Sequence, residues 1–443
     1  MRLPRLVPRC LFPLLLLTVA VTPSTSYAQA AAAASSSVPL AKPESVGLSS
    51  AALATMDEGM QGLIDKQHLA GIVTLVARHG KVVQYKAYGM QDLQSRTPMR
   101  TDTIARIYSM TKPVTGVAMM MLYEDGKWQP SDPIAKHIPE FANLKVYAGV
   151  DASGAPILQA PAHPPTMAEL MSHTAGFTYG LFGNTAVDKL YQTDPPLNAR
   201  SLKAFIDRMA TLPLLYQPGE RWVYSVSVDI QGYLVEKLSG KTFPEFLRTR
   251  IFDPLGMKDT AFFVPEEKVS RVATIYSWRA AEGTLVADRR DPQISTPPLL
   301  PSGGGGLYST AADYFRFAQM LLNGGQLDGK RLLKASTVEM MRTNILSEQV
   351  LNSKSGIGQA VFSPAQGFGY DVAVVLDPPA ARRQVGKGSY WWWGAAGTWF
   401  WIDPTNDVVM VGIIQRRNNV PGSVNHEDVS RTVVTEALMK ARP

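Results

Sequence analysis

Apolar residues recur at two different spacings, which divide the chain into helical and extended segments. Residues 49–68 carry apolar side chains at helical spacing behind a serine that can cap the first turn, and they predict a helix. Residues 72–77 and 82–85 are rich in apolar and β-branched side chains and flank the sequence His79-Gly80-Lys81. A glycine turn between two such runs predicts a β-hairpin.

The same two patterns return near the C-terminus. Residues 398–402 and 408–415 predict a second hairpin, and residues 429–440 predict a closing helix. The middle of the chain is instead rich in proline and in helical patterns, with few clean strands. We therefore expect a sheet domain built from residues 41–124 and 296–443, with a mostly helical domain, residues 125–295, inserted between its two halves.

Residues 1–28 have the layout of a secretory signal peptide. Three arginines precede an apolar run at 11–21 that is too short to span a bilayer, and small residues follow it. Cleavage is expected after Ala28 or Ala30, and residues 29–40 read as a flexible leader. These features predict an exported protein, periplasmic or secreted, with no stable membrane anchor.

Charge and residue spacing argue against several functions. The formal charge of +7 includes the three arginines of the signal peptide, and no cluster of Lys and Arg stands out, so we expect no nucleic-acid binding. The six histidines lack metal-binding spacings, so we expect no metal and no cofactor. The only cysteine, Cys10, lies in the signal peptide, which leaves the mature chain without a thiol nucleophile. The sequence does not predict an oligomeric state.

Ser109-Met110-Thr111-Lys112 is the only place in 443 residues where a lysine follows a serine by three positions. The apolar residues after it predict a helix, on which positions i and i+3 share one face. A lysine beside a serine and shielded from water can lose its proton and activate the hydroxyl, and N–H groups at a helix N-terminus can stabilise an oxyanion. A serine cap followed by a solvated lysine is the structural alternative.

A serine nucleophile needs a partner that returns a proton to the leaving group. Tyr224 lies between an extended piece and a helix predicted at 228–238, a position from which it can project into a cleft beside a lysine. Taken alone, such a tyrosine is more often part of a core. His173 is better explained as a residue that shapes a loop. No Gly-x-Ser-x-Gly occurs in the sequence, which argues against an α/β-hydrolase.

Three consecutive tryptophans run directly into the small residues at 394–397. Small residues in a strand permit the close approach of a ligand or of another backbone, and the indoles offer apolar walls. The alternative is an edge strand over a packed aromatic core, which is a serious competitor for Trp399 and Trp401.

Three of these segments together resemble the serine β-lactamase superfamily, and most closely class C β-lactamases and family VIII carboxylesterases. They are residues 109–112, 224–226 and 392–397. Segments 170–176 and 302–313 add to a likeness that covers nearly the whole mature chain. The resemblance implies an α+β fold of the β-lactamase and penicillin-binding-protein type. In that fold an antiparallel sheet is flanked by helices, a mostly helical domain is inserted, and the site lies in the cleft between the two.

Matched position by position, the resemblance implies a role for each motif residue. Ser109 would attack the substrate carbonyl, Lys112 would activate it, and Tyr224 would carry the proton. The backbone N–H groups of Ser109 and Ala395 would form the oxyanion hole. The substrate would be a small ester, amide or β-lactam.

Two departures from the family pattern bear on the substrate. Val226 replaces an asparagine of class C β-lactamases, and Trp392-Trp393-Gly394 replace a Lys-Thr-Gly whose lysine attracts the β-lactam carboxylate. The predicted substrate-binding residues are Trp392, Trp393, Gly394, Ala396 and Val226.

Losing a cation and gaining indole surface favours a carboxylesterase that acts on neutral, apolar esters, with at most weak β-lactam hydrolysis. A β-lactamase, a D-amino-acid peptidase or an acyltransferase on the same scaffold stays open. A non-catalytic relative that binds cell-wall peptides is the more remote alternative.

Overall fold

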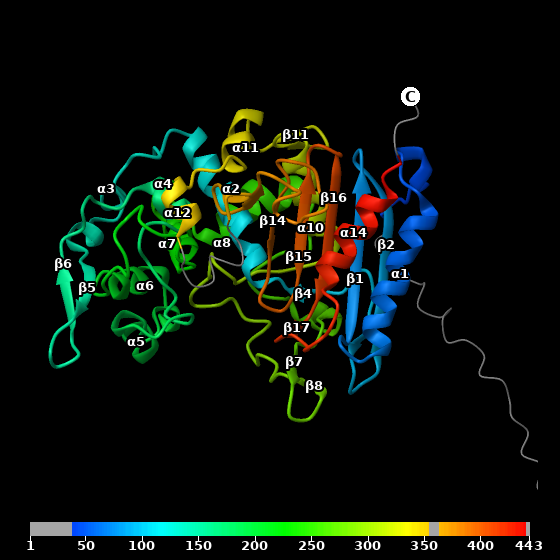
Figure 1. Cartoon of the computed structure of the whole chain (residues 1–443), viewed down its shortest axis with the longest axis horizontal. Helices are drawn as coiled ribbons and strands as arrows, with labels where there is room; N and C mark the ends of the chain where they lie inside the picture. Colours follow the sequence, from blue (N-terminus) through cyan, green and yellow to red (C-terminus); the bar gives the residue numbers. More distant parts are fainter. Residues whose placement is uncertain (1–37, 354–362, 440–443) are drawn as a thin grey trace, which may run out of the picture. The chain divides into compact units, whose positions relative to one another are not determined.

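The large sheet is antiparallel and is built from both ends of the chain, as the sequence predicts. The computed structural model describes residues 38–353 and 363–439. The strand order is β12-β13-β14-β15-β16-β1-β2-β3 (Figure 1). The strands are β1 (Gly71–Arg78), β2 (Lys81–Asp92), β3 (Thr97–Pro98), β12 (Gln366–Phe368), β13 (Ala373–Val375), β14 (Tyr390–Trp393), β15 (Trp399–Asp403) and β16 (Val408–Ile414).

Both predicted hairpins form the middle of this sheet. β1 and β2 pair across the glycine turn, and β15 and β16 pair across the turn at 404–407. β1 also pairs with β16, in a register that places Val76 opposite Met410, and both side chains are buried. This pairing joins the two ends of the chain into one sheet.

Helices cover both faces of the sheet. α1 (Ser50–Asp65) and α14 (His426–Ala437), blue and red in Figure 1, pack against each other on one face. α10 (Ala311–Leu322) contacts β16, β1 and β15 from the other face. Two successive residues of β15 establish this, because successive side chains of a strand point to opposite faces. Trp399 donates to Ser430 of α14, whereas the ring of Phe400 lies 5.0 Å from that of Tyr314 in α10.

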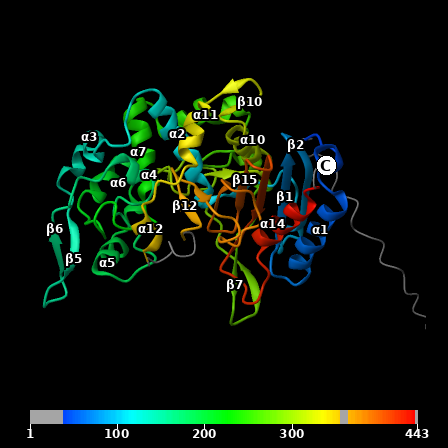
Figure 2. The same ribbon diagram turned by 45° about the horizontal axis from the view of Figure 1, so that its top comes forward.

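The middle of the chain is mostly helical around α7 (Ser227–Ser239), which contacts α2, α3, α4, α6 and α8 (Figure 2). The bounds are α2 (Thr111–Glu124), α3 (Ile134–His137), α4 (Met167–Met171), α5 (Ala186–Thr193), α6 (Leu202–Met209), α8 (Phe243–Leu247) and α9 (Asp253–Leu255). The described residues form one compact unit, so the division into a sheet domain and a helical domain stays a prediction.

Two hairpins in this region are not predicted by the sequence. They are β5 (Val146–Val150) with β6 (Pro156–Gln159), and β7 (Tyr276–Arg279) with β8 (Thr284–Ala287). β7 also pairs in parallel with β17 (Arg416–Arg417). These strands are only four or five residues long, so an apolar alternation in them covers too few positions to mark a strand in a sequence.

Several shorter elements complete the described chain. They are η2 (Pro43–Val46), η3 (Tyr108–Met110), η4 (Pro139–Asn143), η5 (Pro196–Asn198), η6 (Arg248–Phe252), η7 (Glu266–Arg271), β4 (Ala105–Arg106), β9 (Tyr308–Ser309), β10 (Gln326–Leu327), β11 (Lys330–Arg331), α11 (Ala335–Met341) and α12 (Glu348–Asn352).

The strand prediction is wrong for the four small residues at 394–397. β14 ends at Trp393 and β15 begins at Trp399, and these two residues pair with each other. The chain must therefore reverse between them. The N–H of Gly394 donates to the carbonyl of Thr398 at 2.7 Å, which closes a hairpin turn.

The predicted signal peptide and most of the predicted leader lie outside the described residues. Residues 38–40 of the leader have no regular secondary structure. Among the helices of the described segments, none combines the length and the apolar character that crossing a membrane requires.

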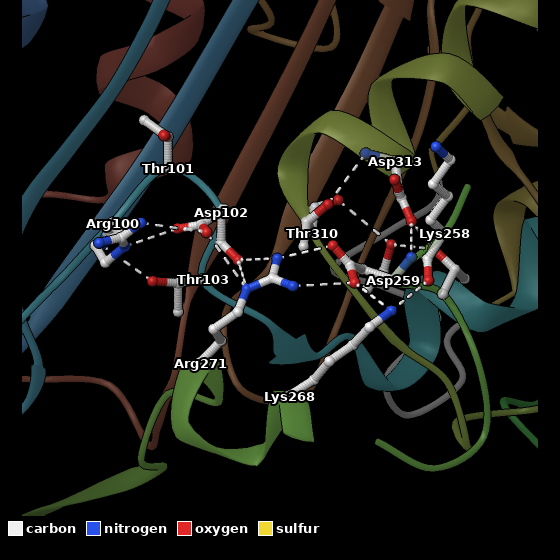
Figure 3. Close-up of polar contacts among 12 residues, drawn as sticks. Arg100, Thr101, Asp102, Thr103, Lys258, Asp259, Lys268, Arg271, Thr310 and Asp313 are labelled. Carbon is white, nitrogen blue, oxygen red and sulfur yellow. Dashed lines mark hydrogen bonds and ion pairs between the residues drawn. The ribbon is translucent and has the colours of Figure 1, made fainter. Parts of the chain in front are cut away.

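A polar network joins three segments that are far apart in the sequence (Figure 3). Arg271 donates to the main-chain carbonyl of Asp102 at 2.6 Å and pairs with the carboxylate of Asp259 at 2.7 Å. The N–H of Asp259 and the hydroxyl of Thr260 then donate to one oxygen of Asp313, at 2.7 and 2.9 Å. Asp313 belongs to the first turn of α10. The network therefore connects the segments that carry Asp102 and Asp259 to that helix.

Candidate active site

Ser109 lies where a strand pair ends and a helix begins. β4 pairs with β9, and the chain then passes through the 3₁₀ turn η3 into α2. Tyr108 has a φ of 44°, in the left-handed region that a non-glycine residue adopts at a cost of about 1–3 kcal/mol. The turn places Ser109 just before the first residue of α2, as the sequence predicts.

Lys112 brings the three predicted catalytic side chains together. It is 1% exposed, and its Nζ lies 3.2 Å from Ser109 Oγ and donates to the carbonyl of Gly304 at 2.7 Å. The same nitrogen lies 4.5 Å from the ring centroid of Tyr224 and 5.4 Å from that of Tyr179. The alternative of a solvated lysine is therefore wrong, because burial removes this amine from water.

Asp229 supports Lys112 indirectly, and sequence reasoning missed it. Its carboxylate accepts from the hydroxyl of Ser302 at 2.5 Å and from the N–H of Gly304 at 3.0 Å. A Cβ on Gly304 would lie 2.6 Å from Asp229 Oδ2, so only glycine permits this approach. Burial raises the pKa of Asp229, and the nearby Lys112 opposes that rise. Gly304 therefore joins the two residues through its own N–H and carbonyl.

Asp371 is a second buried carboxyl group near Lys112. It lies just before β13 with a φ of 60°, and one of its oxygens accepts from the side chain of Gln231 at 3.2 Å. Its other oxygen has no hydrogen-bond partner among the described residues, and it faces Gly116 of α2. Burial raises its pKa well above the ordinary value, opposed by the bond from Gln231 and by Lys112.

Tyr224 stands in an aromatic cluster. Its ring centroid lies 5.2 Å from that of His173, 5.3 Å from Tyr179, 5.7 Å from both Trp222 and Trp392, and 6.0 Å from Phe182. The Trp222 ring is nearly parallel to it, at 11°. These contacts fix the orientation of the Tyr224 ring over the amine of Lys112.

His173 shapes the loop that carries it, in agreement with its structural interpretation. Its φ is 59°, and its Nδ1 is 3.0 Å from the hydroxyl of Ser225. Burial lowers its pKa well below the ordinary value, so the ring is neutral at neutral pH. No contact between His173 and Ser109 or Lys112 is present among its hydrogen bonds in the described chain.

The hairpin turn after β14 docks onto the segment that leads to Ser109. The hydroxyl of Thr398 donates to the carbonyl of Ile107 at 3.2 Å, and a Cβ on Gly394 would lie 2.3 Å from that same oxygen. Ala395 follows at an exposed position, and its N–H has no acceptor among the described residues. The turn thus offers a free backbone donor beside the Ser109 segment.

The predicted substrate-binding residues differ in exposure. Trp393 is half-buried, whereas Trp392, Val226 and Ala396 are at most 1% exposed. The carbonyl of Ala396 accepts from the N–H of Arg416 at 2.9 Å, which fixes the turn to β17. Within the described residues, no group of three His, Cys, Asp or Glu side chains could hold a metal ion. The binding roles stay predictions.

The family model described as Beta-lactamase matches residues 54–432. The chain belongs to this family. Protein Rv1367c of Mycobacterium tuberculosis is 37% identical over 352 residues, which cover 78% of this chain and 86% of the relative. Esterase EstB of Burkholderia gladioli is 29% identical over 380 residues, which cover 81% of this chain and 89% of the relative. The solved structure of EstCE1, described as a hydrolase with promiscuous acyltransferase activity, matches with a TM-score of 0.72 at 25% identity over 87% of this chain and 99% of that chain.

The matches confirm that this Beta-lactamase family member is related to serine β-lactamases and to their esterase relatives, as the sequence predicts. They also confirm the α+β fold. Other relatives carry different activities in their names. An acyltransferase of Monascus pilosus and a putative D-alanyl-D-alanine carboxypeptidase of Escherichia coli are each 26% identical. The family therefore includes several acyl-transfer chemistries.

Sequence reasoning missed Tyr179, Asp229 and Asp371. Asp229 had one usable signal, an acidic residue between Val228 and Ile230 in a helix that is otherwise apolar at that point. Asp371 and Tyr179 have no comparable signal, because only the fold brings them to Lys112.

Proposed function

We propose that this family member is a serine hydrolase that forms an acyl-enzyme at Ser109 and acts as a carboxylesterase on small esters. The observation that carries the proposal is the buried Lys112 amine, 3.2 Å from the Ser109 hydroxyl and under the ring of Tyr224. A buried amine beside a hydroxyl is one arrangement that activates serine for nucleophilic catalysis.

Acylation would proceed in one addition and one elimination. Ser109 Oγ forms a bond to the ester carbonyl carbon while its proton passes to the Lys112 and Tyr224 pair. The N–H groups of Ser109 and Ala395 stabilise the oxyanion. The bond from carbon to the alcohol oxygen then breaks, and the leaving alkoxide takes the proton from Tyr224. A water molecule repeats the attack on the acyl-enzyme, which releases the acid and returns the proton to Ser109.

The group next to the scissile bond is proposed to be neutral and apolar. Trp392 and Trp393 stand in β14 where β-lactamases carry a lysine, with ring centroids 4.6 Å apart and Trp392 5.7 Å from Tyr224. Phe182, which is 49% exposed, adds apolar surface 6.0 Å from the ring of Tyr224. Trp392 is buried, so Trp393 and Phe182 supply the accessible apolar surface, which favours an apolar acyl or alcohol group over the carboxylate of a β-lactam.

Acyl transfer to an alcohol or amine is the second candidate function. It is favoured by the acyltransferase relatives and by the promiscuous acyltransferase activity in the description of EstCE1. It uses the same acyl-enzyme, with an acceptor in place of water. Acyl transfer and hydrolysis are distinguished by adding a short alcohol and measuring the new ester.

The test compares a short-chain p-nitrophenyl ester with nitrocefin, using wild type, Ser109→Ala and a control, Ser131→Ala, at an exposed serine. We expect wild type and S131A to hydrolyse the neutral ester with a higher kcat/KM than nitrocefin. S109A should lose about a thousandfold or more. Equal ester turnover by wild type and S109A would refute the nucleophile, and a preference for nitrocefin would refute the esterase assignment.

The proposal places the mature enzyme outside the cytoplasm, on the strength of residues 1–28 alone. Fractionation of cells that express the full chain, with N-terminal sequencing of the product, would test this. A product that begins after Ala28 or Ala30 is expected, and an intact N-terminus in the cytoplasm would contradict it.

A further inference from the structure

A pocket of about 430 Å³ adjoins the segment that carries Ser109, and arginines dominate its charged lining. Its cationic residues are Arg106, Arg279, Arg289, Arg290 and Arg417, against two acidic ones, Asp288 and Asp291. Three positive charges are therefore left unbalanced. The volume lies within the range of small-molecule sites, about 300–1,000 Å³.

Three segments far apart in the sequence build this pocket. Arg106 and Tyr108 come from β4 and η3, Arg417 comes from β17, and the remaining lining comes mostly from residues 272–294 around the β7–β8 hairpin. Figure 1 shows β17 and β7 side by side at one end of the large sheet. The apolar part of the lining, including Ile275 and Ile294, would suit a hydrocarbon chain next to an anionic group.

Tyr108 connects the pocket to Ser109, its immediate neighbour in the chain. Its hydroxyl accepts from Arg417 Nη2 at 2.6 Å, and the guanidinium of Arg106 lies 4.8 Å from the centroid of its ring. Arg106 Nε is buried and has no hydrogen-bond acceptor among the described residues. The buried Nε holds the Arg106 side chain in the pocket wall, and guanidinium N–H groups on such a wall are donors suited to an oxyanion.

The pocket also adjoins the turn that carries Ala395. Gln415 lines the pocket, and its side chain exchanges hydrogen bonds with the backbone of Arg106 at 3.0 and 3.2 Å. The next residue, Arg416, donates its N–H to the carbonyl of Ala396. Residues that line the pocket are therefore the chain neighbours of Ser109 and of Arg416, which bonds to the turn that carries Ala395.

We propose that this pocket binds a carboxylate carried by the ester substrate at a distance from the scissile bond. The inference rests on the proposed esterase function and refines it: the substrate is neutral and apolar at the ester and anionic at its far end. Guanidinium groups pair with carboxylates through parallel N–H donors. A monoanion fits better than a phosphate dianion, because Asp288 and Asp291 lie in the same lining and would repel the second charge.

The kinetic test compares mono-p-nitrophenyl glutarate, which carries a free carboxylate, with neutral p-nitrophenyl valerate. The variants are Arg106→Gln, Arg417→Gln and a control, Arg250→Gln, at an exposed arginine that pairs with Asp125. We expect the ratio of kcat/KM for the glutarate to that for the valerate to fall about tenfold in R106Q and in R417Q, the usual loss of a charged hydrogen bond. The ratio should stay at the wild-type value in R250Q. An unchanged ratio in both pocket variants would overturn the proposal.

A binding measurement separates failure of this inference from failure of the proposed function. Titration calorimetry of monomethyl glutarate, a monoanion, into the Ser109→Ala protein needs no catalysis. Saturable binding that is weakened about tenfold by R106Q and R417Q is expected. Binding of inorganic phosphate without binding of monomethyl glutarate would overturn the carboxylate assignment, as would the absence of any binding of monomethyl glutarate. Active S109A protein would instead refute the nucleophile and leave the calorimetric result standing.

Discussion

At the scale of single residues, the Ser109 and Lys112 contact follows directly from the sequence. Ser109 lies in the 3₁₀ turn η3, which runs directly into α2, so the three-residue spacing still brings the two side chains to one face, and the observed separation is 3.2 Å. Asp229 and Gly304 could not be paired in this way, because 75 residues separate them and a close backbone approach brings them together. Local periodicity predicts contacts within an element and gives no information on such loop packing.

Asp229→Asn should reduce activity without unfolding the protein. The change removes the negative charge near Lys112, while the remaining Oδ1 can still accept from both Ser302 and Gly304, so the fold around Gly304 is kept. We expect kcat/KM for a p-nitrophenyl ester to fall by about tenfold or more. Steady-state kinetics on folded protein, verified by circular dichroism, measures this.

The matched control is Asp207→Asn on α6, where the carboxylate is exposed and pairs with Lys203. That variant should stay within about twofold of wild type, as surface ion pairs contribute little. If D229N is folded and as active as D207N, Asp229 does not support the arrangement of Lys112.

At the scale of elements, hairpins whose strands are long, apolar and buried could be predicted from the sequence. A tight turn made of small residues could not. β1, β2, β15 and β16 carry long apolar runs that indicate strands. Residues 394–397 have no side chains that distinguish a strand from a turn, so their conformation depends on which strands pair. The pairing of Trp393 with Trp399 decides it.

Gly394→Ala should separate the β14 turn from the Ser109 segment. An added Cβ would lie 2.3 Å from the carbonyl oxygen of Ile107, a backbone atom that cannot rotate away. We expect kcat/KM per folded molecule to fall by about tenfold or more, together with a lower melting temperature.

Gly62→Ala in α1 is the control for this change. A Cβ there meets no atom within 4 Å, so the substitution should raise the free energy of unfolding by about 0.5–1 kcal/mol through helix propensity. Wild-type activity and stability in G394A would show that the close contact with Ile107 is not needed.

At the scale of the whole molecule, charge is distributed in a way that the sequence does not reveal. The pocket arginines lie in separate segments around residues 106, 279, 289 and 417, and no window of the sequence contains a conspicuous basic run. The net charge and runs of like-charged residues in a sequence indicate charged tails or charged helix faces. A pocket whose arginines come from separate segments forms only when the chain folds.

The network around Asp313 makes the stability of the whole molecule depend on pH (Figure 3). Burial raises the pKa of Asp313 to about 6 from an ordinary 3.8. The folded state therefore holds this proton more tightly than the unfolded chain. The stability that the proton contributes is full below about pH 4 and is lost as the pH rises through 6.

Asp313→Asn should remove this pH dependence. Relative to the variant, wild type should lose about 2 kcal/mol of unfolding free energy between pH 4 and pH 7, which is most of the cost of ionising the buried carboxyl. Urea denaturation of both proteins at the two pH values measures the difference. A difference that is constant across this pH range would contradict the raised pKa.

The central claim is that Ser109 is the residue acylated during turnover, and trapping the adduct tests it most directly. Wild-type protein would be treated with a fluorophosphonate, its intact mass measured, and the labelled peptide mapped. The account predicts one adduct, on Ser109, with loss of esterase activity in proportion to labelling, and no adduct on Ser109→Ala. An adduct on another residue that accompanies inactivation, or an unlabelled protein that still hydrolyses esters, would contradict it.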